Sequence, residues 1–220
     1  MNKMLPVVTF PSRPASSAAA NPLITVPMDD SSCGETMRVP MTAAQVMALL
    51  ASARANKKGK LIPALTMALF GGLRLCEIRR LTCKEIDFDT GKVLVVDTAT
   101  ANDKKARLVR LPPDAREWLR LHGGNPLMDE TWMLDYRRFQ DSTGLYVPSG
   151  GLRQTCVAYM LHKNGDSATT MYWTGIPTAR LHRLFTTPIE AREVFVFWNL
   201  TPSSLTSADQ APELVLQSCS

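Results

Sequence analysis

Apolar residues recur at helical spacing in several segments of this 220-residue chain. Past residue 42, the positions of Val46, Leu49, Leu50 and Ala53 form one apolar stripe, which predicts an amphipathic helix. The preceding segment 42–45, Thr-Ala-Ala-Gln, is typical of a capping box, in which two side chains satisfy the first free backbone N–H groups. Further helices are predicted at residues 62–70, 115–121, 130–141, 152–163 and 191–198.

Two short segments in the middle of the chain are typical of a β-hairpin. The segment 88–92, Phe-Asp-Thr-Gly-Lys, indicates a tight turn, and Val-Leu-Val-Val follows at residues 93–96. The segment 107–111, Arg-Leu-Val-Arg-Leu, alternates polar and apolar residues and is expected to pair with it. Helices therefore precede and follow one small sheet. This order predicts an α+β fold that is mostly helical with a small antiparallel β-sheet.

The two ends of the chain differ from its middle. Residues 1–40 hold six of the 15 prolines and show no sustained periodicity, so we expect a disordered leader. Residues 203–220 form a polar tail that offers little to a core. The remaining segment, residues 41–202, is predicted to be one domain.

Charge and cysteine content restrict the partners and the compartment. The net charge of +5 and the pI near 9.1 suit a polyanion such as nucleic acid, although charge alone does not establish one. The five cysteines form no CxxC pair, which argues against a zinc site or a disulfide framework and for a reducing compartment. No apolar run approaches the ~18 residues of a membrane span. We expect a cytoplasmic protein that needs no membrane, metal or cofactor.

Two segments place an arginine directly after Gly-Gly-Leu. The first covers residues 71–74 and ends at Arg74, and the second covers residues 150–153 and ends at Arg153. A planar guanidinium is the side chain best shaped to hold a phosphate at two points. Two arginines, each held at the start of a helix by a glycine-bearing turn, can converge on one anionic group.

The helix predicted after Arg74 carries a candidate acidic partner. Leu75, Ile78 and Leu81 lie at helical spacing on one apolar face, and Glu77 is expected to point away from that face. Because Glu77 follows Arg74 by three residues, it can orient the guanidinium or simply pair with it on the helix surface. The sequence leaves both roles open.

These segments together resemble the catalytic domain of the tyrosine recombinases, the phage integrase family. The resemblance runs from about residue 41 to residue 202. It is strongest over residues 68–119, where Gly-Leu-Arg-x-x-Glu-Ile-x-x-Leu precedes Ile-Asp-Phe, a hairpin and Arg-Leu-Val-Arg-Leu-Pro. The resemblance implies a phosphoryl-transfer site for DNA that uses neither metal nor ATP.

The resemblance assigns catalytic roles to several positions. Arg74 and Arg153 correspond to the two arginines that clamp the scissile phosphate. In the family, a hairpin lysine protonates the leaving 5′ oxygen, which requires a lowered lysine pKa. Strict spacing places Asn102 at that position, and Lys104 is a shifted substitute.

Three positions depart from the family pattern together. Gly150 stands where many members have a histidine, and Ile176 stands at another position that is usually polar. The nucleophilic tyrosine is expected about thirty residues after Arg153, and Phe185, which has no hydroxyl, occupies that position. Tyr172 lies only nineteen residues after Arg153 and is a poor replacement. We therefore expect strand cleavage to be impaired.

The resemblance suggests a DNA integration or site-specific recombination protein of a mobile element, bound to duplex DNA. A homo-oligomer on DNA is one arrangement that it allows. The main alternative is a non-catalytic DNA-binding or partner-binding remnant, and an inert helical remnant is a third reading. Expected DNA contacts are Lys57, Lys58, Lys60, Arg79, Arg80, Lys105, Arg107 and His182.

Overall fold

One helix lies at the centre of the molecule and is buried along its whole length. In the computed structural model, every residue of this helix, α2 (Ile62–Gly71), is buried, as expected for a helix that is apolar on nearly all sides. The structure describes residues 39–97, 105–122, 127–176, 181 and 188–204. Apart from residues 39–40 and 203–204, the predicted leader and tail lie outside this described part.

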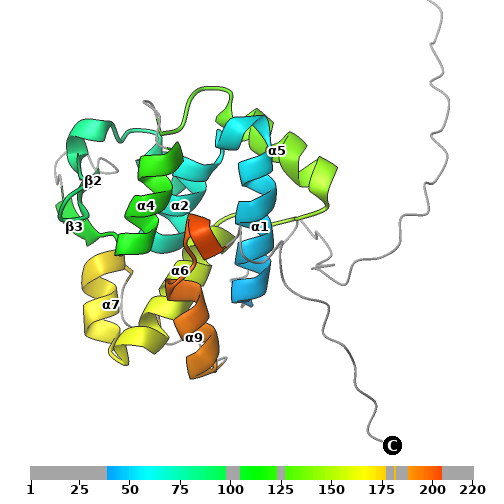
Figure 1. Ribbon diagram of the computed structural model, residues 1–220. Coiled ribbons are helices and arrows are strands. Elements are labelled where there is room, and N and C mark those ends of the chain that lie inside the picture. Colours follow the sequence, from blue (N-terminus) through cyan, green and yellow to red (C-terminus); the bar gives the residue numbers. More distant parts are fainter. Residues whose placement is uncertain (1–38, 98–104, 123–126, 177–180, 182–187, 205–220) are drawn as a thin grey trace, which may run out of the picture.

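Other helices surround α2 (Figure 1). Both α4 (Pro113–His122) and α6 (Gly151–Asn164) pack directly against it. The first helix, α1 (Ala43–Ala55), contacts α2 and α9 (Ala191–Trp198), and α9 also packs on α6. Aromatic side chains of α5 (Trp132–Thr143) enter the same core. No helix in the described part of the chain has both the length and the apolar content to span a membrane.

A small antiparallel sheet lies to one side of the helices (Figure 1). Within the described residues its strand order is β1 (Ile86–Asp87), β2 (Lys92–Asp97), β3 (Lys105–Arg110). Val93 pairs with Val109, and Val95 pairs with Arg107. Since paired and alternate residues share a face, the three valines and Arg107 all face inward. The helix α7 (Ser167–Thr174) packs against β3.

The sequence predicted this arrangement in outline. The mostly helical α+β fold with one small antiparallel sheet is confirmed. The capping box of α1 is also confirmed, because the Gln45 amide donates to Thr42 Oγ1 (3.2 Å) and the Thr42 amide donates to Gln45 Oε1 (2.9 Å). The helix predicted at residues 191–198 has the same bounds in the structure.

The helix predicted after Arg74 is shorter than expected. Only one turn, α3 (Leu75–Ile78), is helical, and the Leu81 amide then bonds to the carbonyl of Ile78 (3.1 Å), a tightened turn that ends the helix. Leu81 is still buried. Glu77 is also buried, at 7% exposed, because its carboxylate is enclosed by the arginines to which it bonds.

Helix α7 was not predicted, although both of its ends carry a local signal. The Asp166 carboxylate accepts bonds from the amides of Ala168 (2.9 Å) and Thr169 (2.8 Å), which caps the first turn. Gly175 ends the helix in the left-handed region, at φ +69°. The short 3₁₀ turns η1 (Lys57–Gly59) and η2 (Cys83–Glu85) were also not predicted.

Hydrogen bonds between distant positions close the fold. The Met41 amide donates to Thr155 Oγ1 (3.1 Å), the Ala43 amide to Glu193 Oε1 (2.5 Å), and Trp118 Nε1 to the Leu200 carbonyl (2.8 Å). The first described segment is therefore attached to α6 and α9, and the last one to α4.

Candidate functional site

The first arginine turn adopts the conformation that its glycine allows. Gly72 follows α2 at φ +63°, in the left-handed region that glycine reaches without strain. A Cβ on Gly72 would lie 3.4 Å from Sγ of Cys156 and 3.8 Å from Cγ2 of Thr174. The turn therefore sits against α6 and α7. This contact brings Arg74, at the start of α3, toward both helices.

The second arginine turn uses the same device. Gly150 precedes α6 at φ +76°, and Arg153 lies in the first turn of that helix, half-buried. The guanidinium of Arg153 donates from Nη2 to the carbonyl of Thr174 at the end of α7 (2.6 Å). Both predicted glycine-bearing turns are thus confirmed. The two turns hold Arg74 and Arg153 at the starts of two different helices, α3 and α6.

The carboxylate of Glu77 accepts hydrogen bonds from two arginines, Arg107 and Arg74. Arg107, on β3, donates from Nη1 to Oε1 and from Nη2 to Oε2, each at 2.8 Å. Arg74 donates from Nη1 to Oε1 (2.9 Å) and from its backbone amide to Oε2 (2.7 Å). The side chain of Glu77 is only 6% exposed, and all of its charge is offset by these contacts.

These four charges affect one another's protonation. Burial would raise the pKa of Glu77, but the hydrogen bonds from Arg107 and the Arg74 backbone, together with the charges of Arg107 and Arg153, lower it to about 2. Burial lowers the pKa of Arg153 to about 10, and the positive charges of Arg74 and Arg107 act in the same direction. Glu77 and Arg153 are therefore charged at neutral pH, and the cluster sets three arginines against one carboxylate.

The arginine cluster, defined as Arg74, Glu77, Arg107 and Arg153, has the character of an anion site. The side chain of Arg74 is 44% exposed and that of Arg107 is 14% exposed, so Arg74 presents the cluster to solvent. The buried Nε atoms of Arg107 and Arg153 have no hydrogen-bond partner among the described residues.

Arg107 takes a different place from the one expected. The sequence suggested an exposed contact to DNA, whereas the structure directs its guanidinium inward to Glu77. The alternation of side chains along β3 indicates this inward orientation, because Arg107 lies two residues before the buried Val109 and four before the buried Leu111. The sequence-based interpretation considered only its charge.

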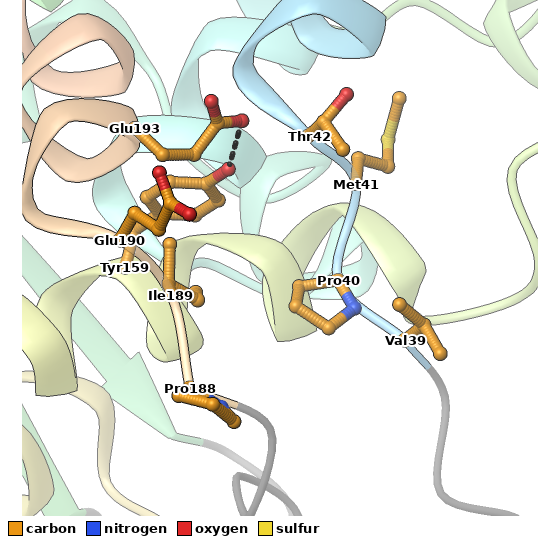
Figure 2. A pocket seen from close by; sticks show the side chains of 9 residues that line it. All are labelled: Val39, Pro40, Met41, Thr42, Tyr159, Pro188, Ile189, Glu190 and Glu193. Carbon is orange, nitrogen blue, oxygen red and sulfur yellow. Dashed lines mark hydrogen bonds between the residues drawn. The ribbon is translucent and has the colours of Figure 1, made fainter.

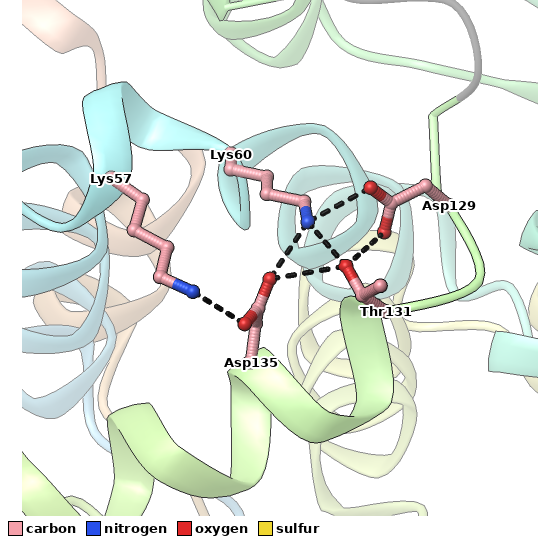
Figure 3. Close-up of polar contacts among 5 residues, drawn as sticks. All are labelled: Lys57, Lys60, Asp129, Thr131 and Asp135. Carbon is pink, nitrogen blue, oxygen red and sulfur yellow. Dashed lines mark hydrogen bonds and ion pairs between the residues drawn. The ribbon is translucent and has the colours of Figure 1, made fainter.

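Two of the expected DNA-binding lysines are held by acidic residues (Figure 3). Lys57 bonds to Asp135 Oδ1 (2.5 Å), and Lys60 bonds to Asp135 Oδ2 (2.7 Å), Asp129 Oδ2 (2.8 Å) and Thr131 Oγ1 (2.6 Å). Hydrogen bonds from both lysines hold the pKa of Asp135 well below its ordinary value. We call these five residues the lysine cluster; it attaches the loop before α2 to α5.

The other expected positions fall into three groups. Lys58, Arg79 and Arg80 are exposed, as a DNA contact requires. Lys105 begins β3, where its backbone pairs with Asp97. The expected catalytic positions Lys104 and Phe185, and the expected DNA contact His182, lie outside the described residues.

A pocket elsewhere on the surface has the opposite character (Figure 2). It holds about 250 Å³ and lies where the first described residues meet the start of α9. Its acidic residues are Glu190 and Glu193, and the Tyr159 hydroxyl donates to Glu193 Oε1 (3.0 Å). Among the described residues that line it none is basic, so this lining does not favour a phosphate.

No protein-family model matches the chain, and no curated protein matches it. Solved structures do. The XerA recombinase aligns over 81% of this chain and 67% of its own, with a TM-score of 0.55 and 15% identity. The catalytic domain of bacteriophage HP1 integrase aligns over 82% of this chain and 99% of its own, with a TM-score of 0.54 and 16% identity.

An integrase of the Tn1549 transposon, in complex with a circular intermediate DNA, aligns over 75% of this chain and 67% of its own, with a TM-score of 0.56 and 16% identity. The described part of the chain therefore has the fold of the tyrosine recombinase, or phage integrase, catalytic domain.

Proposed function

We propose that this protein binds duplex DNA through its phosphates, as part of a DNA integration or site-specific recombination system, with impaired strand cleavage. The observation that carries the proposal is the arginine cluster. Three guanidinium groups from α3, β3 and α6 surround one carboxylate and leave a positive surplus. The buried Nε of Arg153 has no acceptor within the described residues.

A phosphate diester supplies what this cluster lacks. Its two non-bridging oxygens accept hydrogen bonds in the planar geometry that a guanidinium presents. Half-buried cations interact with such an anion more strongly than exposed ones, because less water screens them. Arg74 and Arg153 are the expected contacts, since Arg107 is bound to Glu77 at both carboxylate oxygens.

Proteins of similar fold support the choice of DNA as the anion. Tn1549 integrase was solved with circular intermediate DNA. A variant of that integrase with a tyrosine-to-phenylalanine substitution was solved with transposon right end DNA. In that protein, the loss of a tyrosine hydroxyl is therefore compatible with DNA binding.

Impaired cleavage rests on the absent functional groups. Phe185 has no hydroxyl with which to attack phosphorus. At Gly150, where a histidine would supply a proton donor or acceptor, no atom lies within 4 Å of the position of a Cβ. Each missing proton transfer is worth typically ~10²–10⁴-fold in rate.

The binding half of the proposal is tested by fluorescence anisotropy with a short labelled duplex. We expect affinity to fall steeply between roughly 50 and 200 mM salt, with a slope of about −0.9 for each phosphate neutralised. Arg74→Ala or Arg153→Ala should weaken binding about tenfold, the value expected for one charge-assisted contact. Arg138→Ala, which removes an exposed guanidinium from α5, is the matched control. Salt-independent binding, or equal losses in all variants, would refute the assignment.

The cleavage half is tested with a suicide half-site substrate and a denaturing gel that retains covalent protein–DNA adducts. We expect no adduct from the wild-type chain and little from Phe185→Tyr, because the other groups are still missing. The triple variant Gly150→His/Ile176→His/Phe185→Tyr has the best prospect, although position 150 is left-handed and a side chain there is strained. A wild-type adduct that disappears with Tyr172→Phe would contradict impaired cleavage.

A further inference from the structure

Arg107 occupies a strand position that usually holds an apolar residue. It pairs across the sheet with Val95, which is 1% exposed, and it shares the inner face of β3 with Val109. Its side chain is only 14% exposed. A Cβ on Gly175, at the end of α7, would lie 3.6 Å from Cδ of Arg107, so the stem of this arginine passes close to a residue without a side chain.

The pairing of Arg107 with Glu77 is the most complete ion pair in the arginine cluster. Two parallel bonds of 2.8 Å join the guanidinium to the two carboxylate oxygens. Arg74 bonds to that carboxylate from Nη1, at 2.9 Å, and its side chain is 44% exposed. The carboxylate is thus neutralised from the interior and oriented toward Arg74 at the same time.

Without Arg107, the same carboxylate would act differently. Glu77 would remain buried with Arg74 as its nearest cation, and burial makes an uncompensated carboxylate unfavourable. The guanidinium of Arg74 would then be drawn to both carboxylate oxygens, which are the same kind of acceptor as the oxygens of a phosphate. Arg74 would be less available for an external anion.

We propose that Arg107 is a positioning residue for the anion site: by holding both oxygens of Glu77, it lets that carboxylate orient Arg74 without competing for it. This inference rests on the proposed DNA-binding function, and it assigns Arg107 no contact with DNA. This role makes the sheet part of the arginine site, since Arg107 on β3 holds the carboxylate of Glu77 on α3.

The test is a double-mutant cycle on duplex DNA binding at low salt, with thermal unfolding of every variant. Arg107→Ala should weaken binding about tenfold, as loss of the Arg74 contact would. Arg107→Lys should weaken it to a similar degree, because an ammonium cannot make two parallel bonds. Arg110→Ala, on the outer face of the same strand, is the matched control and should change binding less than threefold.

Two double variants distinguish positioning from direct contact. Arg107→Ala/Glu77→Gln should regain most of the lost affinity, because the competing charge is gone. Arg74→Ala/Arg107→Ala should bind no more weakly than Arg74→Ala, because Arg107 acts through Arg74. Additive losses without rescue would show that Arg107 itself contacts phosphate, and would overturn the inference.

The remaining outcomes are equally decisive. Wild-type affinity in Arg107→Ala, or an equal loss in Arg110→Ala, would overturn the inference while the DNA-binding proposal stands. If the wild-type chain does not bind DNA, the proposed function fails and the inference fails with it. If Arg107→Ala does not fold, Arg107→Lys and the rescue in Arg107→Ala/Glu77→Gln carry the test.

Discussion

The arginine cluster and the lysine cluster differ in charge balance, although the sequence suggested both as contacts for DNA. The arginine cluster sets three cations against one carboxylate, and Arg74 remains 44% exposed. The lysine cluster sets Lys57 and Lys60 against Asp129 and Asp135, so its charges cancel. A surplus of charge in space, rather than a run of basic residues in the sequence, marks the anion site.

The side chains also suit these two uses. A guanidinium has a planar fork that can serve a carboxylate and still carry further donors, whereas an ammonium is a compact point charge. Lys60 reaches three oxygen acceptors around one corner of α5, which is effective for attachment (Figure 3). The proposed function therefore places the additional anion at the arginine cluster, whereas the lysine cluster attaches the loop before α2 to α5.

The largest expected effect is a difference in DNA affinity between variants of the arginine cluster and variants of the lysine cluster. Arg74→Ala/Arg153→Ala should bind a short duplex about a hundredfold more weakly, from two charge-assisted contacts of ~1.5–3 kcal/mol each. Lys57→Ala/Lys60→Ala, which also removes two positive charges, should change affinity by less than about threefold. Anisotropy titrations at one low salt concentration measure both. Equal losses would mean that the lysine cluster opens to meet DNA.

The next effect is on stability, and here the lysine cluster is expected to matter. Asp135→Ala should lower the thermal unfolding midpoint by several degrees, since Lys57 loses the carboxylate to which it bonds and Lys60 keeps Asp129 alone of its two carboxylates. Glu130→Ala, at an exposed position just before the same helix, is the control. An unchanged midpoint in Asp135→Ala would show that the lysine cluster contributes little to folding.

A smaller effect concerns acid stability. The pKa of Glu77 is lowered from 4.5 to about 2, so this carboxylate stabilises the fold above its ordinary pKa, and the contribution is lost as the pH falls from about 4.5 toward 2. The unfolding midpoint of Glu77→Gln should therefore fall less than that of the wild type between pH 5 and about pH 3. Parallel profiles for the two proteins would contradict the ion pairs of Glu77 with its arginines.

The sequence predicted most of the fold because its signals were local. The capping box before α1, the apolar run of α2 and the alternating strands each lie within a few residues and have one physical interpretation. The shortened α3 and the missed α7 show the limit. Glu77 is buried because an arginine thirty residues away bonds to it, and no local pattern contains that partner.

The site was predicted in part for the same reason. Arg74 and Arg153 were found because glycine turns mark them in the sequence, and the structure places both turns as expected. The role of Arg107 depended on which face of β3 is buried, and the fate of Lys57 and Lys60 depended on α5. Charge along the chain indicated where cations are, but only the fold shows which carboxylates they meet.

The bonds that attach the first helix to the last segment have a consequence for how the chain is completed during synthesis. The amide of Ala43, at the start of α1, bonds to a carboxylate 150 positions later. The indole N–H of Trp118 donates to the carbonyl of Leu200, 82 positions later. Contacts of such sequence separation form late and slow the folding reaction. In a nascent chain that has not yet released α9, the first helix therefore has α2 to pack against but lacks the bond from Ala43 to Glu193.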